Sequence, residues 1–529
     1  MPTVLIADKL AQQSVDVLKQ AGLEVIHKPG LTPEQLKEAV RGVEGVIVRS
    51  GAKFTADILA EAGELKAVCR AGVGVDNIDV AAASRQGVVV MNTPGANTIS
   101  TAEHTIALML ALSRNVGPAY LSMREGRWDR KRFMGAELAA TTLGVVGLGR
   151  VGRAVAARAA AFDMKIAAYD PYISREAAAK LGVKVHDSLE ELLKTCDYLT
   201  VHVPGGDRTR GMIGGAQIAL MKPTARLVNC ARGDVVDRDA VVAAVREGRL
   251  AGAAFDVYSP EPPGDFEFAR HDAILATPHL GASTEAAQIA VGIQAAEQMA
   301  GALLRGHYRN AINVTSVPPE EKGILRPYCE LAYRMGQVIG TLNSGRLRSL
   351  EVMCTGVLAE HNATPVADHG VLGVLQAVLG DTVNIVSAPH LARERGLHVT
   401  CTTSLDQKGG FTDLVSLALS TDASDLEVAG TVFGPGHIRM VKVGPFRTEV
   451  VPEGHLLLAF GQDKPGLIGS IGDTLFAAGV NIARMTFGRT EPGGDCLLAL
   501  NLDSSCEEGT LEAIRALPAV DRAVRVALR

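Results

Sequence analysis

The sequence predicts an α/β protein that begins with two Rossmann-like, doubly wound parallel sheets. Its 529 residues are too many for one hydrophobic core, and 47 % of them are apolar, which is enough for several cores. Short apolar strands alternate with amphipathic helices over roughly the first 280 residues, as is typical of parallel sheets. An α+β region follows, and the chain ends in a βαββαβ pattern.

The first alternation spans residues 1–98 and contains four strand candidates. Each is a short apolar run bounded by polar residues: Val4–Ala7, Gly45–Val48, Ala67–Cys69 and Val88–Met91. A helix is predicted from Ser100 to Arg114, with Ser100 or Thr101 as its N-cap and Glu103 in its first turn.

The second alternation spans residues 99–284. Its strands are predicted at Leu143–Val146, Lys165–Tyr169, Tyr198–Val201, Arg226–Asn229, Gly252–Asp256 and Ile274–Ala276. A long helix over Glu285–Leu304 then leads back to the first unit. The first domain is therefore predicted to be discontinuous, comprising residues 1–98 and 285–312.

The remaining chain is predicted to form two further domains. Val317–Lys322 is polar and Pro-rich, which indicates a linker. Residues 315–450 mix helix and strand patterns without a catalytic motif, and residues 453–529 form the βαββαβ unit. Its strands are predicted at His455–Phe460, Asn481–Gly488, Cys496–Leu502 and Ala519–Val526, and its helices at Leu467–Ala478 and Glu507–Leu517.

Composition excludes several classes of partner. A net charge of -5 provides no basic field for nucleic acid. The densest apolar run, Ile106–Leu112, is far too short to span a membrane. Eight scattered cysteines without a CxxC pair suggest reduced, mostly buried thiols, and the amino terminus lacks a signal-peptide pattern. The sequence thus predicts a soluble cytoplasmic protein with neither nucleic-acid nor membrane partners.

A GxGxxG motif follows the first strand of the second alternation. It comprises Gly147, Gly149, Arg150, Val151 and Gly152, between an apolar strand and an Ala-rich helix. The glycines permit a tight turn, close approach of a pyrophosphate and helix–strand packing, while the helix N-terminus offers amides to the phosphates.

The next strand ends in Asp170, about twenty residues after the motif. A carboxylate there binds ribose hydroxyls and repels a 2′-phosphate, so the motif favours NAD over NADP. The alternative is a glycine-rich turn in another α/β sheet, with Asp170 as an ordinary loop residue.

Three polar side chains follow successive strands of the same sheet. Arg232, Glu261 and His279 lie where an open α/β sheet binds its ligands. Histidine suits the base that takes a hydroxyl proton, arginine binds a carboxylate, and a carboxylate beside the imidazole stabilises its charged form. These residues predict oxidation of a 2-hydroxy acid. Each alone is also compatible with a structural role.

The segments Gly147–Gly152, Asn229–Gly233 and Thr277–Ala282 resemble the signatures of the D-2-hydroxyacid dehydrogenase family. The resemblance implies that Arg232, Glu261 and His279 are catalytic, that Arg150 and Val151 contact the pyrophosphate, and that Asp170 contacts the adenine ribose. It further implies contacts near the nicotinamide from Cys230, Ala231, Arg232, Asp256, His279, Leu280, Gly281 and Ala282. Val73 and Val203 stand where relatives often carry threonine, so a hydroxyl contact to the cofactor is lost at both positions.

The amino-terminal segments around Arg49, Arg70 and Asn92–Thr98 resemble the phosphoglycerate-oxidising branch of that family. This implies a small anionic hydroxyacid substrate, 3-phospho-D-glycerate, and NAD as cofactor in the first step of serine synthesis. The implied substrate-binding residues are Arg49, Ser50, Arg70, Gly72, Gly74, Asn97 and, from a neighbouring subunit, Arg130.

The carboxy-terminal segments Gln462–Leu467 and Gly479–Ile482 resemble an ACT domain, a module that binds small amino acids. The resemblance implies L-serine as an inhibitory effector at Asp463 and Asn481, and a homotetramer. His437, Arg439, Lys442 and Arg447 lie close together in the intervening region and form either an anion site or a solvated basic face. The alternatives for the whole chain are a hydroxypyruvate, glyoxylate or D-lactate-type reductase, and an NAD-sensing regulator.

Overall fold

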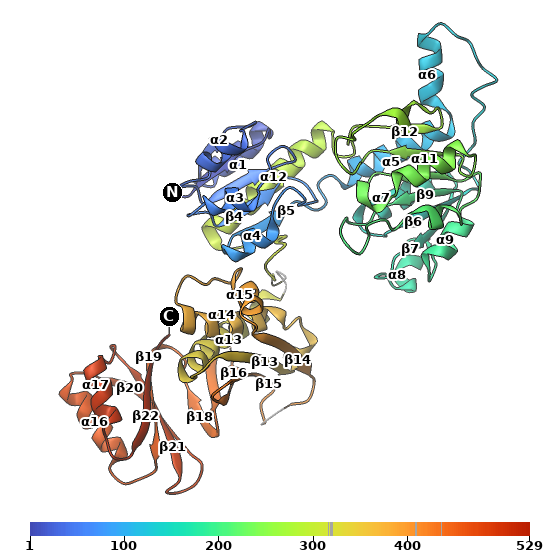
Figure 1. Cartoon of the computed structure of the whole chain (residues 1–529). Helices are drawn as coiled ribbons and strands as arrows, with labels where there is room; N and C mark the ends of the chain where they lie inside the picture. Colours follow the sequence, from blue (N-terminus) through green and yellow to red (C-terminus); the bar gives the residue numbers. More distant parts are fainter. Residues whose placement is uncertain (316, 318–320, 408–409, 435, 529) are drawn as a thin grey trace.

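The computed structural model describes residues 1–315, 317, 321–407, 410–434 and 436–528, which form four sheets. Two parallel sheets in separate lobes are followed by a mixed sheet and a fully antiparallel one (Figure 1). This confirms the predicted fold class. Residues 318–320 of the predicted linker 317–322 lie outside the described residues.

The first sheet has the strand order β2-β1-β3-β4-β5, and every pairing is parallel. The strands are β1 (Thr3–Ile6), β2 (Glu24–His27), β3 (Gly45–Val48), β4 (Ala67–Arg70) and β5 (Val89–Asn92). One face packs on α1 (Gln12–Gln20) and the returning α12 (Glu285–Arg305). The other face packs on α2 (Pro33–Ala39), α3 (Ala56–Ala60) and α4 (Val80–Arg85). We call this unit the first lobe.

The second sheet has the order β12-β11-β10-β9-β6-β7-β8, again all parallel. Its strands are β6 (Thr142–Val146), β7 (Lys165–Tyr169), β8 (Lys184–Val185), β9 (Tyr198–Val201), β10 (Arg226–Asn229), β11 (Gly252–Phe255) and β12 (Ile274–Ala276). The strand order reverses between β6 and β9, which is the point where doubly wound sheets bind ligands. We call this unit the second lobe.

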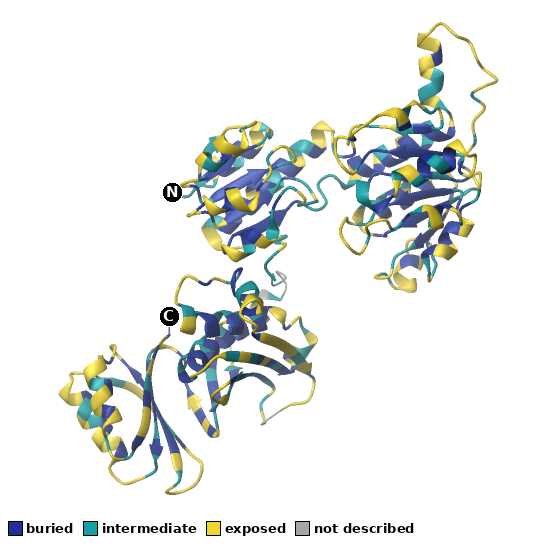
Figure 2. Ribbon diagram, viewed as in Figure 1, coloured by how far each residue is buried: buried dark blue, intermediate teal, exposed yellow. Residues whose placement is uncertain are grey.

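Helices cover both faces of the second sheet. One face packs on α5 (Thr98–Ser113) and α7 (Arg150–Ala160), and the other on α9 (Leu189–Thr195) and α11 (Arg238–Arg246). Two short helices, α8 (Arg175–Ala179) and α10 (Gly215–Ile218), complete the lobe. Burial on both faces explains why the central strands are continuous apolar runs (Figure 2).

The predicted cap of α5 is wrong. The helix begins at Thr98, so Ser100 and Thr101 lie inside its first turn, and no side chain caps it. Ser100 instead donates its hydroxyl to the carbonyl of Gly281, at 2.8 Å. Glu103 lies beyond the first turn and pairs with Arg158 at 3.4 Å. The chain passes from the first lobe to the second as it enters this helix. The start of the helix therefore depends on this passage between lobes rather than on a local cap.

An arm projects from the second lobe (Figure 1). It consists of α6 (Val116–Arg124) and the irregular segment that follows it. Large apolar side chains on it are exposed, among them Tyr120, Met123, Trp128 and Met134. Arg130 lies on this arm and is also exposed.

The third sheet has the order β14-β13-β15-β16-β17-β18 and is antiparallel except for the β13–β14 pair. Its strands are β13 (Leu347–Gly356), β14 (His398–Ser404), β15 (Asp413–Thr421), β16 (Asp425–Phe433), β17 (His437–Val443) and β18 (Phe446–Val450). The helices of this region are α13 (Lys322–Leu342), α14 (Thr364–Leu379) and α15 (Ala388–Glu394).

The fourth sheet has the order β20-β21-β19-β22 and carries two helices, so the predicted βαββαβ sequence is confirmed. Its elements are β19 (Gly454–Gln462), α16 (Leu467–Ala477), β20 (Ile482–Arg489), β21 (Asp495–Leu502), α17 (Glu508–Arg515) and β22 (Val520–Leu528). Leu458 and Val526 from this sheet share one core with Leu331 and Met335 of α13. The third and fourth sheets are therefore joined by packing as well as by the chain.

Within the described residues, no helix is both long enough and apolar enough to cross a membrane. All eight cysteines are free thiols; seven are buried and Cys401 is exposed. The expectation of mostly buried cysteines is thus confirmed.

Candidate active site

The structure brings His279 and Glu261 together, although they follow different strands. The imidazole Nδ1 of His279 lies 2.9 Å from Glu261 Oε2. The other carboxylate oxygen of Glu261 accepts the backbone N–H of Tyr258 at 3.0 Å. A carboxylate can only accept, so Nδ1 carries the proton and Nε2 is left as the basic nitrogen. This is the arrangement that a histidine base requires.

Glu261 is ionised in this arrangement. Partial burial raises the pKa of its carboxyl, but the hydrogen bonds from His279 and Tyr258 and the charges of His279 and Arg232 outweigh it. The net pKa lies below the usual range for a glutamate. Glu261 is therefore a fixed negative charge beside the imidazole.

The loop that carries His279 is held in an unusual conformation. His279 has φ 55°, in the left-handed region that few residues other than glycine adopt. The next two amides, of Leu280 and Gly281, donate to opposite oxygens of Asp256 at 2.7 and 2.8 Å. Asp256 is 1 % exposed, so its carboxylate acts as a buried anchor for this turn.

Both lobes line one cleft of about 1040 Å³ that contains this pair. Arg232 enters it from the end of β10, and its Nε lies 3.4 Å from Asp76 of the first lobe. A Cβ on Gly74 would approach Arg232 Nη2 to 2.1 Å and Asp76 Oδ2 to 2.6 Å, so a larger residue there would have to displace these two side chains. Cys230 and Ala231, just before Arg232, are buried, whereas Ala282 lines the cleft.

Positive charge gathers on the first-lobe wall of the cleft, which includes Arg49, Ser50, Arg70 and Gly72. Burial lowers the pKa of Arg70, and repulsion from Arg232 and Arg49 contributes to this lowering. Arg70 donates to backbone carbonyls of Arg49 and Gly74, which fixes its position. An anion bound here would relieve the repulsion between these cations.

Asn97 and Asp8 add to the description of this wall. Asn97 lines the cleft, and its buried Oδ1 has no hydrogen-bond partner among the described residues. Asp8 was not predicted as a site residue, yet its carboxylate accepts the amides of Arg49 and Ala52 at 2.6 and 3.1 Å. It therefore fixes the loop that presents Arg49.

The glycine motif forms the turn between β6 and α7. Gly147 has φ 93°, and a Cβ on it would meet the carbonyl oxygen of His202 at 2.8 Å. A Cβ on Gly152 would lie 2.0 Å from the carbonyl oxygen of Gly147, whereas one on Gly149 would meet nothing within 4 Å. The first and third glycines are thus required by the fold, and the second leaves open space above the helix N-terminus.

Asp170 ends β7 beside this turn. Its carboxylate accepts the amides of Leu148 and Tyr172 at 2.7 and 2.9 Å. Arg150 extends towards the first lobe and donates to the carbonyl of Pro94, while Val151 packs in the core beneath the turn. The residues present therefore fit a dinucleotide, with Asp170 placed for a ribose.

The two predicted effector residues lie beside strands of the fourth sheet, Asp463 just after β19 and Asn481 just before β20, and already have partners. Asp463 accepts from Arg489 at 2.7 Å and from the Gly493 amide at 3.1 Å, and these bonds lower its pKa. Asn481 donates to Asp503 at 2.7 Å.

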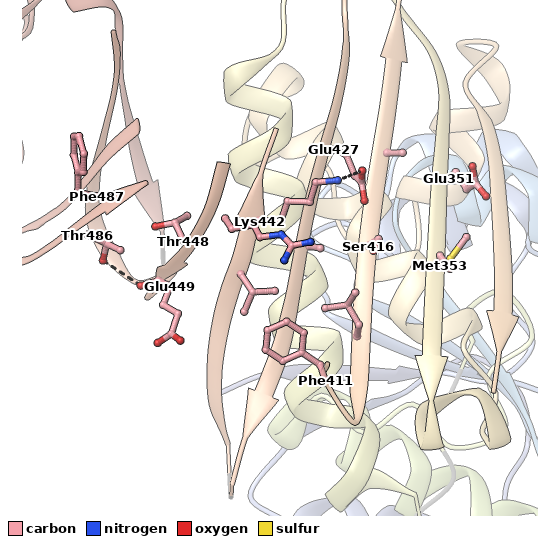
Figure 3. A pocket seen from close by; sticks show the side chains of 15 residues that line it. Glu351, Met353, Phe411, Ser416, Glu427, Lys442, Thr448, Glu449, Thr486 and Phe487 are labelled. Atoms are coloured by element: carbon pink, nitrogen blue, oxygen red, sulfur yellow. Dashed lines mark hydrogen bonds and ion pairs between the residues drawn. The ribbon is translucent and has the colours of Figure 1, made fainter. Parts of the chain in front are cut away.

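A second cleft, of about 900 Å³, lies between the third sheet and β20 (Figure 3). Of the four predicted basic residues, only Lys442 and Arg447 line it, and Lys442 pairs with Glu427 at 2.5 Å. Three carboxylates line the same cleft, those of Glu351, Glu427 and Glu449. The surface is therefore of mixed charge, and the hypothesis of a basic anion site receives no support from it.

Comparison with known proteins agrees with this geometry. Residues 106–281 match the family model for the NAD binding domain of D-isomer specific 2-hydroxyacid dehydrogenase, and residues 324–444 match the D-3-phosphoglycerate dehydrogenase intervening domain. A D-3-phosphoglycerate dehydrogenase from Methanocaldococcus jannaschii is 40 % identical and covers 98 % of both chains. One from Archaeoglobus fulgidus is 39 % identical over 99 % of this chain and 100 % of its own.

Two solved structures each match a little over half of this chain. A protein from Thermus thermophilus is 35 % identical with TM-score 0.54, covering 59 % of this chain and 99 % of its own. An NAD+-bound 3-phosphoglycerate dehydrogenase from Entamoeba histolytica is 29 % identical with TM-score 0.51, covering 59 % of this chain and 98 % of its own.

This chain belongs to the D-isomer specific 2-hydroxyacid dehydrogenase family. The matched domain of that family binds NAD, which confirms the predicted cofactor. The relatives that match it along almost their whole length are D-3-phosphoglycerate dehydrogenases, so the resemblance noted from the sequence is confirmed as well.

The two glycines of the motif allow a matched test of the dinucleotide site. Gly149→Ala should leave the thermal unfolding of the cofactor-free protein unchanged, because its φ of -66° suits alanine and its surroundings are open. It should raise the Kd for NADH about tenfold or more, because the new methyl group occupies the space of the pyrophosphate. Fluorescence titration with NADH measures the affinity.

Gly152→Ala is the comparison variant. Its Cβ would clash with a backbone oxygen, so it should destabilise the cofactor-free protein by about 1–3 kcal/mol. Unchanged NADH affinity in Gly149→Ala would contradict the assignment of the pyrophosphate position.

Proposed function

We propose that this chain is an NAD-dependent D-3-phosphoglycerate dehydrogenase. It oxidises 3-phospho-D-glycerate to 3-phosphohydroxypyruvate, the first step of L-serine biosynthesis. The observation that carries the proposal is the His279–Glu261 pair, which shares one cleft with Arg49, Arg70 and Arg232. Relatives of that name match the chain from end to end, including its third sheet.

His279 is the proposed base. Nε2 takes the proton of the substrate C2 hydroxyl, and the charge that forms on the imidazole is stabilised by Glu261 at Nδ1. Bound NAD accepts the hydride that leaves C2. In the reverse direction, the same imidazole returns the proton to the carbonyl oxygen of the 2-oxo acid.

Arg232 is the proposed ligand of the substrate carboxylate and of the C2 oxygen. Its planar guanidinium can donate two parallel hydrogen bonds, and Ala231 O and Asp76 already fix its direction. It therefore orients C2 towards the base and favours the polarised carbonyl of the product.

The first lobe supplies the remaining contacts in this proposal. Arg49 and Arg70 bind the phosphate, the amides around Gly72 and Gly74 face the carboxylate, and Asn97 uses its unpaired Oδ1 to accept from the substrate. Within the described residues, the guanidinium of Arg49 has no protein partner, which leaves it free for an anion. Unphosphorylated acids offer these cations no second charge.

Two features of the assembly remain part of the proposal. Arg130 lies on the projecting arm, whose exposed apolar side chains suit contact with another copy of the chain in a homotetramer. The fourth sheet is proposed to act as an ACT domain that binds L-serine near Asp463 and Asn481. Its shared core with α13 couples it to the region of the third sheet.

The proposed substrate is tested by comparing kcat/KM for NADH-dependent reduction of phosphohydroxypyruvate, hydroxypyruvate, glyoxylate and pyruvate. The phosphorylated acid should be preferred by about 100-fold or more, because its phosphate satisfies cations that otherwise remain unpaired. Arg49→Gln should reduce that preference and change pyruvate turnover little. A wild-type preference for an unphosphorylated acid would overturn the proposed substrate, while no turnover of any acid would favour the NAD-sensing regulator.

Serine inhibition is tested with point variants, because truncation before β19 would remove the fourth sheet's part of the core that it shares with α13. Asp463→Asn and Asn481→Ala should each raise the serine concentration for half-inhibition about tenfold or more, with kcat unchanged. Asp521→Asn, an exposed substitution on β22, is the control and should behave as wild type. If the wild-type enzyme ignores serine, the regulatory proposal is wrong while the catalytic one stands.

A further inference from the structure

The anchor of the His279 loop has its own buried support. Asp256 Oδ1 lies 3.1 Å from Nε2 of His104, a residue of α5 that is far from it in sequence. Thr277 donates its hydroxyl to the same oxygen at 2.6 Å, and its Oγ1 also lies 3.1 Å from the His104 Nε2. His104 and Asp256 thus form a second histidine–carboxylate pair, which supports the loop of the His279–Glu261 pair.

The direction of these hydrogen bonds follows from the charge of Asp256. Burial raises the pKa of its carboxyl, but bonds from His104, Thr277 and the amides of Leu280 and Gly281 outweigh burial and hold it below its usual range. An ionised carboxylate only accepts, so His104 must carry its proton on Nε2. His104 is therefore a donor, and its side chain is only 19 % exposed.

Helix α5 grips the loop at two points. Ser100 Oγ donates to the carbonyl of Gly281, while His104, one turn further along, donates to the carboxylate that binds the Gly281 amide. Three of the four hydrogen bonds on Asp256 come from the strand-end segment itself, namely from Thr277, Leu280 and Gly281. His104 supplies the fourth, which ties the Asp256 carboxylate itself to α5.

We propose that His104 is a positioning residue for the base His279, acting through Asp256 and Thr277. This inference rests on the proposed dehydrogenase function. Without the His104 donor, the Asp256 carboxylate loses its bond to α5, and only the Ser100 hydroxyl still ties the strained turn at His279 to that helix. The imidazole then departs from the geometry in which Nε2 meets the substrate hydroxyl, and small displacements of such groups cost large factors in rate.

A pair of variants of equal side-chain length tests the inference. His104→Gln places an amide N–H close to the position of Nε2, whereas His104→Met has the same reach and no donor. His104→Met should lower kcat about 10- to 100-fold, with the Kd for NADH within about twofold of wild type. His104→Gln should restore most of that loss, because only the donor differs. Thr277→Val removes the other side-chain donor, should show the same selective loss of kcat, and replaces His104→Met if that variant does not fold.

The outcomes separate this inference from the proposed function. A wild-type protein without turnover of any 2-oxo acid would overturn both. An active wild type with equal rates in the Met and Gln variants would overturn only the role of His104. Parallel losses of kcat, NADH affinity and thermal stability in His104→Met would also overturn it, because they indicate a merely structural contribution.

Discussion

The buried carboxylate of Asp256 is the interaction on which the site depends most. It lies just after β11, where the parallel strands end, and it binds the turn after β12 together with α5. A buried ion is costly unless every lone pair is used, and here hydrogen bonds surround it. These hydrogen bonds offset the cost of burial and fix the turn at His279. The turn places the imidazole against Glu261.

The two lobes come into contact around the cleft where glycine backbone of the first lobe lies close to arginine side chains of the second. Gly74 of the first lobe lies against Arg232 of the second, and Gly95 lies against Arg150. At both places a larger residue would have to displace the arginine side chain. The arginines proposed to bind the substrate, from the first lobe, and the proposed base, from the second, therefore line one cleft. An anion bound between them completes the charge balance.

Much of the fold could be predicted because most strands of the parallel sheets are buried on both faces and appear as apolar runs. The edge strands β2 and β8 were missed, since they are short and partly polar. The proposed catalytic residues followed from their positions after strands and from family resemblance. Sequence reasoning could not find His104 or Asp8 as supports, because each acts on a segment distant in the chain. The start of α5 was misplaced for a similar reason: it depends on a crossing between lobes.

The central claim is that His279 and Glu261 act as one catalytic unit. Single-turnover NADH oxidation by His279→Gln, Glu261→Gln and the double variant measures this directly. The account predicts that the double variant is no slower than His279→Gln, because Glu261 works only through the imidazole. Losses that multiply in the double variant would show two independent roles and contradict the account.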